Sequence, residues 1–292
     1  ALPIYIIRIV LTGYSDAESV INAINEGQVF RFIHKPWDEQ ELKMTIENAR
    51  QLHHLRITNR QLVKDLQNKV SELERTLKLF MRYVPEPVVK KSLEIGEETM
   101  FEGELRKIAV LFCDMRKFTQ ISEEQSPKEV VSFLNNYYSM MSEPIKKYNG
   151  IINQFVGDEI FAIFGAPLML QHPCHHAVHC ALEMRDRIHL LNEQYSARFN
   201  TEIMIGIGIN YGDVIAGNLG SEDKIDYSVT GDTVNTGKRI EMLSKHIPNS
   251  ILISETVYEP VRDIIDAHAW GPVELKGKKG KMQVYEVRGR RD

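Results

Sequence analysis

A heptad repeat between residues 52 and 84 limits the architectures open to this chain more than any other stretch does. Such a repeat favours a long helix that pairs with a second copy of itself in a parallel two-stranded coiled coil. A single amphipathic helix packed on a domain is the alternative, but the repeat is longer than a typical globular helix. The apolar residues form two series, Val63, Val70, Leu77 and Val84, and Leu52, Leu66, Leu73 and Phe80.

A long helix in the middle of a chain separates the segment before it from the segment after it. We therefore predict four segments, a fragment over 1–51, the coiled-coil helix over 52–84, a linker over 85–104 and a larger domain over 105–292. Two prolines, at positions 85 and 87, end the helix and mark the start of the linker.

The fragment over 1–51 alternates between strand and helix, which is typical of a parallel sheet. Thr12 and Lys35 stand at the ends of its two strands. The arrangement resembles the second half of a response-regulator receiver domain, in which such a threonine and lysine contact a phosphoryl group. A receiver carries its phospho-accepting aspartate on earlier strands, so we do not expect this fragment to be phosphorylated. The expected helices run from Asp16 to about Glu26 and from about Glu39 to Arg50.

The composition of the chain limits the kinds of binding partner and the cellular compartment that we expect. The chain has 292 residues, 26% of them charged, and a net charge of −4, which predicts a globular protein without a nucleic-acid partner. We find no apolar stretch of the length that a membrane span needs and no signal peptide. The cysteines at 113, 174 and 180 lack the paired spacing of a disulfide framework, which favours the cytoplasm.

The domain over 105–292 is predicted to be an α+β, ferredoxin-like sandwich with extra strands, because its elements follow a β-α-β-β-α-β order. A strand, "KIAVLFCDM", precedes a helix that a capping box opens at Ser126 and Glu129. A hairpin, "IINQF" with "IFAIF", leads to a long helix from about His172 to Tyr195. The remaining elements are a glycine-punctuated strand pair, "EIMIGIGINYGDVIAGNLG", a helix from Asp232 to Lys245, the strand "SILIS" and a final β region.

Two aspartates occupy neighbouring points of this predicted sheet. Asp114 ends the first strand and Asp158 lies at the tip of the hairpin, and in a ferredoxin-like sheet these strands are adjacent. Carboxylates that converge in this way suit Mg²⁺, and two such ions serve in-line phosphoryl chemistry. Each acid also has a purely structural explanation, since Gly157 and Asp158 make a good tight turn and a strand-end aspartate often caps the next element.

Further candidate groups lie on the helix predicted after Gly231. Asn235 and Arg239 are four residues apart and share a helix face, where arginine suits phosphate oxygens and asparagine can orient a sugar. The histidines and cysteines of "HPCHHAVHC" are also a conceivable zinc site, but no second ligand pair occurs at structural-zinc spacing, and surface histidines are the commoner explanation.

Five motifs together resemble a class III nucleotidyl cyclase domain over nearly all of residues 105–288. By this resemblance Asp114 and Asp158 bind two metal ions per active site, Mg²⁺ or Mn²⁺, and the carbonyl of Met115 is a further ligand. Asn235 positions the ribose and Arg239 stabilises charge on the α-phosphate. The motifs are "AVLFCDMRKFT", "FVGDEIFAIFGAP", "GIGINYGDVIAGNLG", "DYSVTGDTVNTGKR" and "ELKGKKGKMQVYEV".

The resemblance also implies a reaction and an assembly. The ribose 3′-hydroxyl attacks the α-phosphate and expels pyrophosphate, while Lys276 is a candidate for holding the terminal phosphates. In this family the aspartates come from one protomer and the asparagine and arginine from the other, so the chain is expected to act as a homodimer. The coiled coil would then control how two chains meet, under an upstream sensor.

Two positions bear on the choice of base. Family members that use ATP usually carry lysine where this chain has Gln154, and aspartate or threonine where it has Ser228; those that use GTP usually carry glutamate, then cysteine or another small residue. An amide and a hydroxyl both donate and accept hydrogen bonds, so they can serve either purine. We predict ATP as the main substrate, with appreciable use of GTP.

Two other functions compete with this prediction. The first is a catalytically silent, dimeric nucleotide-binding module, because a change at position 154 is also what a drifting site would show. The second is a diguanylate cyclase, whose related fold has a comparable acidic hairpin. It is disfavoured because "VGDEI" lacks the paired glycines of that family and because the helix with Asn235 and Arg239 has no place in it.

Overall fold

The computed structural model describes residues 6–13, 21, 29–81, 83–95, 103–221, 225–275, 277 and 280–291. The chain divides into two compact units, Ala1–Arg82 and Tyr83–Asp292, and each is described by itself. Within the described ranges no helix has both the length and the apolar character needed to cross a membrane.

The first unit contains a parallel strand pair and one very long helix. Strands β1 (Ile9–Thr12) and β2 (Arg31–His34) pair in parallel, as predicted, and the backbone N–H of Lys35 donates to the carbonyl of Thr12 at 2.8 Å. The helix expected from Asp16 to about Glu26 lies outside the described residues except for Ile21.

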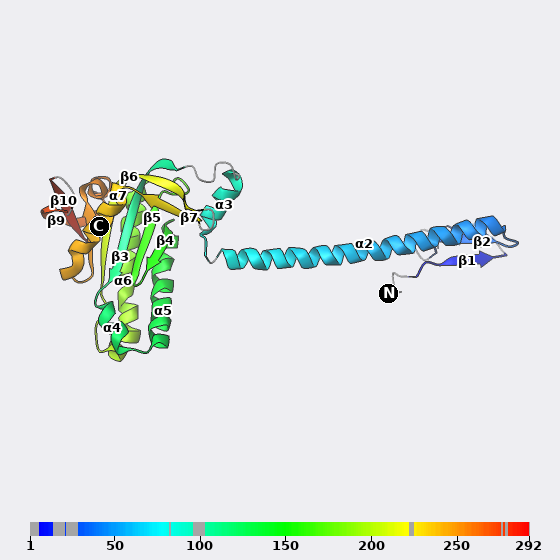
Figure 1. Ribbon diagram of the computed structural model, residues 1–292, viewed down its shortest axis with the longest axis horizontal. Helices are drawn as coiled ribbons and strands as arrows, with labels where there is room; N and C mark the ends of the chain where they lie inside the picture. Colours follow the sequence, from blue (N-terminus) through cyan, green and yellow to red (C-terminus); the bar gives the residue numbers. More distant parts are fainter. Residues whose placement is uncertain are drawn as a thin grey trace. The chain divides into compact units, whose positions relative to one another are not determined.

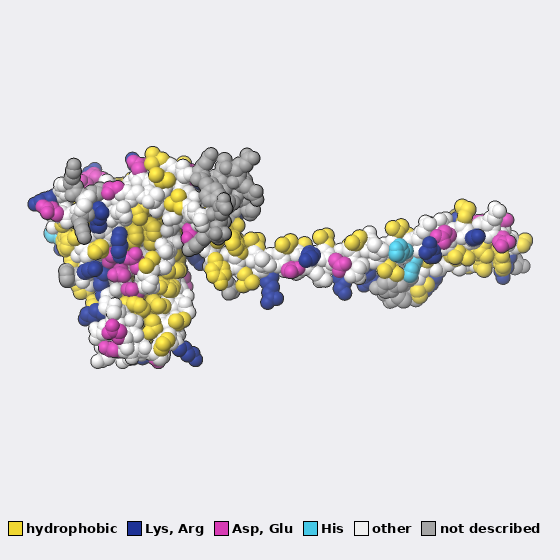
Figure 2. Space-filling model, in the orientation of Figure 1, with side chains coloured by type: hydrophobic (Ala, Val, Ile, Leu, Met, Phe, Trp, Pro, Cys, Tyr) yellow, Lys and Arg dark blue, Asp and Glu magenta, His cyan; other side chains and the backbone are white. Residues whose placement is uncertain are grey.

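Helix α2 (Glu39–Phe80) joins two segments that the sequence suggested as separate helices. It runs for 42 residues, and Asp38 caps its start by accepting from the backbone N–H of Glu41 at 2.9 Å. The join is explained by the sequence, because neither proline nor glycine occurs between residues 39 and 80. The helix ends at Phe80, short of the predicted residue 84. Leu52 is half-buried, but the apolar heptad positions from Val63 to Phe80 are exposed in the single chain, with Leu66 at 65% and Leu73 at 67%, and apolar side chains stand along the helix in Figure 2.

The second unit is built on an eight-stranded sheet (Figure 1). Four strands in the order β4-β5-β3-β6 form the predicted β-α-β-β-α-β unit, and the strands β8, β10 and β9 extend it beyond β6. Strand β7 pairs with β6 alone. The bounds are β3 Glu104–Met115, β4 Ile151–Val156, β5 Glu159–Phe164, β6 Ile205–Gly220, β7 Ile225–Thr230, β8 Ser250–Ser254, β9 Ile265–Glu274 and β10 Lys281–Arg290.

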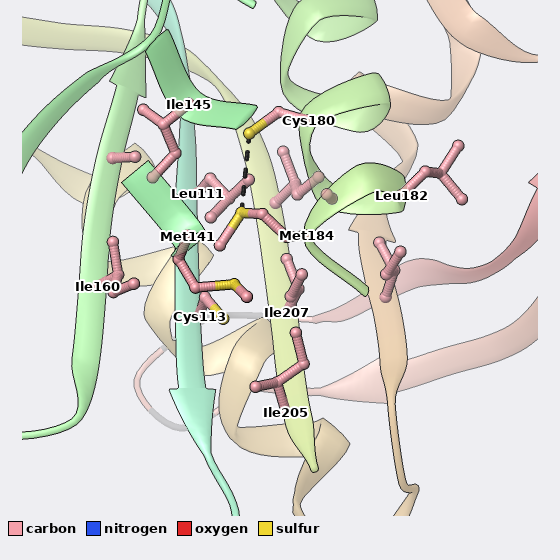
Figure 3. Packing of buried hydrophobic residues seen from close by; sticks show 14 of the residues in the cluster. Leu111, Cys113, Met141, Ile145, Ile160, Cys180, Leu182, Met184, Ile205 and Ile207 are labelled. Carbon is pink, nitrogen blue, oxygen red and sulfur yellow. Dashed lines mark hydrogen bonds between the residues drawn. The ribbon is translucent and has the colours of Figure 1, made fainter. Parts of the chain in front are cut away.

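Helices cover both faces of this sheet because residues along β3 alternate between two cores. Ala109, Leu111 and Cys113 point into the larger core, which α5, α6 and α8 close (Figure 3), whereas Val110 and Phe112 point to the opposite face, on which α7 packs. The helices are α3 Glu86–Ile95, α4 Phe118–Glu124, α5 Pro127–Lys147, α6 Pro173–Phe199, α7 Asp232–Leu243 and α8 Glu255–Val261, with a 3₁₀ turn at Ser244–His246. At the start of α5 the backbone N–H and the hydroxyl of Ser126 both donate to the carboxylate of Glu129, at 3.2 and 2.7 Å, which confirms the capping box.

The predicted strand pair over 202–220 is wrong, because β6 is one continuous strand of 16 residues and its hairpin partner is β7. Its glycines make room for helix α7 instead of turning the chain. A Cβ atom at Gly208 would lie 2.2 Å from the backbone nitrogen of Glu241, and one at Gly212 would lie 2.7 Å from the hydroxyl of Thr233. Helix α7 is therefore held unusually close to the sheet.

Candidate active site

Asp114 and Asp158 lie beside each other, as the predicted topology requires. Asp114 is the penultimate residue of β3, and the preceding Cys113 pairs with Ile160 of β5. Asp158 occupies the two-residue turn between β4 and β5, where Gly157 has a φ of 62° that favours glycine. The negative charge of Asp114 is close enough to act on the carboxyl group of Asp158.

The electrostatics of the pair favour a bound cation. Burial, and after it the negative charge of Asp114, raise the pKa of Asp158 from 3.8 to about 6. A hydrogen bond from the backbone of Met115 acts in the opposite direction. A positive charge between the two acids would relieve both the repulsion and part of the desolvation.

The donor set fits a hard divalent ion that is completed by substrate. Among the described residues no group of three or more histidine, cysteine, aspartate or glutamate side chains could hold a metal. Mg²⁺ is commonly bound by one or two carboxylates together with substrate phosphates. The pair of Asp114 and Asp158 matches this pattern, and the buried Met115 at the end of β3 lies next to it.

A chain of ion pairs, which sequence reasoning missed, starts at Asp114 and ends beside Asp158. Arg116 donates to Asp114 at 3.0 Å and to Glu241 of α7 at 2.9 Å. Lys238, also on α7, donates to Glu241 at 2.8 Å and forms a second ion pair with Glu159. Each of the two cations therefore lies between two carboxylates. The ion pairs join segments that are far apart in the sequence, so no local sequence pattern predicts this series of ion pairs.

Glu159, the residue after Asp158, lies against helix α7. Its side chain is 14% exposed and is engaged by Lys238. The turn that carries Asp158 is thus tied to α7 through the next residue.

Helix α7 carries Asn235 and Arg239 on a face different from the one that holds the ion pairs. At 100° per residue, the direction midway between positions 235 and 239 is roughly 110° from the direction midway between 238 and 241. Asn235 is exposed and Arg239 is half-buried, with its guanidinium beside Gly277. Within one chain, therefore, the face with Asn235 and Arg239 is not the face that contacts Arg116 and Glu159 beside the aspartate pair.

The strands that carry Gln154 and Ser228, β4 and β7, are not neighbours in the sheet, but one hydrogen bond joins them. The side-chain amide of Asn153 on β4 donates to the carbonyl of Tyr227 on β7 at 3.1 Å, and Gln154 and Ser228 each follow one of these two residues. Gln154 is exposed and Ser228 is half-buried. Lys276, the remaining residue singled out from the sequence, lies outside the described residues.

The cysteines of "HPCHHAVHC" belong to the core. Cys174 and Cys180 are buried, and burial raises the pKa of Cys174 to about 12. Cys180 donates to the sulfur of Met184 at 3.7 Å inside the cluster shown in Figure 3. Burial therefore accounts for both thiols in this motif.

Comparison with known proteins gives the family. Residues 101–289 match the adenylate and guanylate cyclase catalytic domain. Adenylate cyclase 1 of Rhizobium meliloti (strain 1021) is 33% identical over 210 residues, which are 72% of this chain and 32% of that protein. The chain thus spans about a third of the length of this curated relative.

Solved structures are similar over the same region. The adenylyl cyclase CyaB from P. aeruginosa aligns with a TM-score of 0.62 at 34% identity, over 65% of this chain and 97% of that one. The guanylyl cyclase Cya2 aligns with a TM-score of 0.60 at 37% identity, over 65% and 95%. The family match covers more than half of the chain, and the chain therefore belongs to the adenylate and guanylate cyclase catalytic domain family.

Proposed function

We propose that this chain is an adenylate cyclase, which converts ATP to 3′,5′-cyclic AMP and pyrophosphate. The observation that carries the proposal is the placement of Asp114, at the end of β3, beside the β4–β5 turn that holds Asp158, in a member of the cyclase family. Asn235 and Arg239, four residues apart on α7, complete the set of groups that the reaction needs.

Asp114, Asp158 and the carbonyl of Met115 would hold two divalent ions per active site, Mg²⁺ or Mn²⁺. When bound, such ions lower the pKa of the ribose 3′-hydroxyl and neutralise charge on the phosphates. The side chains themselves supply orientation and a proton acceptor.

The proposed reaction is intramolecular. A bond forms between the 3′-oxygen and the α-phosphorus, and the bond from the α-phosphorus to the bridging oxygen of pyrophosphate breaks. Asp114 accepts the proton of the 3′-hydroxyl. Asn235 orients the ribose, Arg239 donates to the α-phosphate as its negative charge grows, and Lys276 holds the terminal phosphates.

A homodimer accounts for the separation of the two faces of α7. If Asn235 and Arg239 of one protomer serve the aspartates of the other, the ion pairs of Lys238 and the catalytic contacts of Arg239 do not compete for the same side of the helix. Each dimer would contain two such shared sites.

The exposed heptads of α2 support a parallel pairing of two chains. With Val70 at position a and Leu73 at position d, Lys69 falls at g and Glu74 at the e position of the following heptad. These are the positions that meet between the strands of a parallel coiled coil, and their charges are opposite. The helix would thereby transmit a signal from the receiver-like fragment and the sensor upstream of it.

Gln154 and Ser228 are the basis for the proposed choice of base, in which ATP is the main substrate and GTP is also used. Gln154 and Ser228 each follow a residue of the hydrogen bond that joins β4 to β7, and we propose that both serve one purine. Both groups can donate or accept, so neither imposes adenine or guanine strictly. We also propose a cytoplasmic location, where ATP is available.

The test is product formation by the purified protein. Cyclic AMP and cyclic GMP would be measured with ATP and GTP in parallel, in the presence of Mg²⁺ or Mn²⁺. We expect cyclic AMP from the wild type and at least about a hundredfold less from Asp158→Ala.

Asp263→Ala is the matched control, because the side chain of Asp263 is 88% exposed and lies outside the proposed site. It should keep full activity. A dimeric wild-type protein that forms neither product with either metal would contradict the proposal and favour a silent nucleotide-binding module.

A further inference from the structure

The pair formed by Arg116 and Glu241 is more deeply buried than a surface ion pair. Arg116 is 8% exposed and Glu241 is fully buried. Burying two charges is unfavourable, and apolar residues of similar volume would often give equal or greater stability. Stability alone therefore explains the pair poorly, and its contact with Asp114 suggests another role.

The fold provides a specific slot for the guanidinium of Arg116. A Cβ atom at Gly206 would lie 1.6 Å from a terminal nitrogen of Arg116 and 2.3 Å from the hydroxyl of Ser244. The same guanidinium donates to Ser244 and to Glu241. Strand β6 and the end of α7 thus fix the arginine from two sides.

The carboxylate of Glu241 balances the charge of this arginine. Arg116 reaches Asp114 at 3.0 Å with one terminal nitrogen and Glu241 at 2.9 Å with the other. Without Glu241, a full positive charge would face the two acids that are to receive divalent ions. A cation in that place repels another cation.

We propose that Glu241 is a positioning residue for metal binding that acts through Arg116. It holds the guanidinium in the Gly206 slot and neutralises it, so Arg116 orients the carboxylate of Asp114 without competing with divalent ions. The inference rests on the proposed function, in which Asp114 and Asp158 bind those ions.

The experiment measures Mn²⁺ binding directly. Free Mn²⁺ would be followed by electron paramagnetic resonance while the full chain is titrated in the presence of 3′-deoxy-ATP, which lacks the attacking hydroxyl. Glu241→Gln should raise the Kd for Mn²⁺ about tenfold or more. Glu241→Asp, which keeps the charge, should recover most of the affinity.

The matched control is Glu183→Gln on α6. Glu183 also bridges two cations, Lys147 at 2.5 Å and Arg187 at 2.9 Å, and is 15% exposed. Its loss should leave Mn²⁺ binding unchanged. An equal loss of affinity in this control would assign the effect to general destabilisation and overturn the inference.

A second variant keeps the inference testable if Glu241→Gln fails to fold. Arg116→Lys retains the charge but lacks the planar fork that spans two carboxylates, so it should also weaken Mn²⁺ binding. Unchanged binding by a folded Glu241→Gln, or by Arg116→Lys in its place, would overturn the inference alone. A wild type that does not bind Mn²⁺ would overturn the proposed function as well.

Discussion

Asp114 lies at the end of β3 beside the turn that carries Asp158, and burial together with the negative charge of Asp114 raises the pKa of Asp158 to about 6. The pair is therefore unfavourable to the metal-free fold. If the pair binds divalent cations as proposed, this loss of stability is the cost of the binding site.

Replacing one of these acids should stabilise the protein while it abolishes activity. The folded pKa of Asp158 lies above its ordinary 3.8, so the penalty is complete above about pH 6 and disappears below about pH 4. In the presence of a chelator at pH 7.5, Asp158→Asn should raise the free energy of unfolding by about 1 kcal/mol, a value reduced for the partial exposure of the group. Thermal unfolding measures this. A lower Tm for Asp158→Asn than for the surface control Asp263→Asn would contradict it.

Position 154 should control the choice of base. Lysine only donates and ionised glutamate only accepts, whereas glutamine does both. Gln154→Lys should therefore shift the ratio of cyclic AMP to cyclic GMP towards cyclic AMP by about tenfold, and Gln154→Glu should shift it the other way. Parallel kcat/KM values for ATP and GTP measure the ratio. A wild type that already discriminates a thousandfold would contradict the premise that glutamine is permissive.

Local signals accounted for much of the site. The turn at Gly157 and Asp158, the capping box of Ser126 and Glu129, and the strand end at Asp114 each depend on a few consecutive residues, and each is found where the sequence predicted it. The β-α-β-β-α-β order then brought the two aspartates together. Such features need no knowledge of packing.

Features that depend on packing between distant segments could not be predicted in this way. The glycines of β6 suggested a turn, but their function is to admit α7, which begins some way along the chain. The bond from Arg116 to Glu241 joins residues 125 positions apart. Their side chains give no periodic signal, and only the close approach of α7 to the sheet reveals them.

The close approach of α7 gives a direct stability prediction. At Gly208 an added Cβ would lie 2.2 Å from the nitrogen and 2.6 Å from the Cα of Glu241, and backbone atoms cannot move aside as a side chain can. Gly208→Ala should destabilise the second unit by about 3 kcal/mol, at the upper end for overpacking. Denaturant unfolding would measure the change. Gly289→Ala, where nothing lies within 4 Å of the added atom, should be nearly neutral, and equal effects would contradict the argument.

The capping box of α5 should make stability depend on pH in acid. Hydrogen bonds from Ser126, followed by that from Arg198, lower the pKa of Glu129 from 4.5 to about 2. Because the folded pKa is depressed, the contribution is complete above about pH 4.5 and is lost as the pH falls towards 2. The stability difference between wild type and Glu129→Gln should thus shrink over this range. Urea unfolding at pH 7, 4 and 2.5 tests it, with Glu123→Gln on α4 as the comparison. A difference that stays constant would contradict the role of the carboxylate.

The a and d positions of the α2 heptads form the seam of the proposed coiled coil, and they predict which leucines hold two chains together. Leu73 lies at position d and is 67% exposed in the single chain, whereas Leu79, at position c of the same helix, is 51% exposed and points away from the seam. Leu73→Glu would place a charge in the interface of each strand, and we expect the dissociation constant of the dimer to rise about a hundredfold, or about 3 kcal/mol. Leu79→Glu should leave it unchanged. Sedimentation equilibrium measures both, and cyclic AMP formation should fall in proportion to the lost dimer if each site is shared as proposed. Equal effects of the two substitutions would contradict a coiled coil in this register.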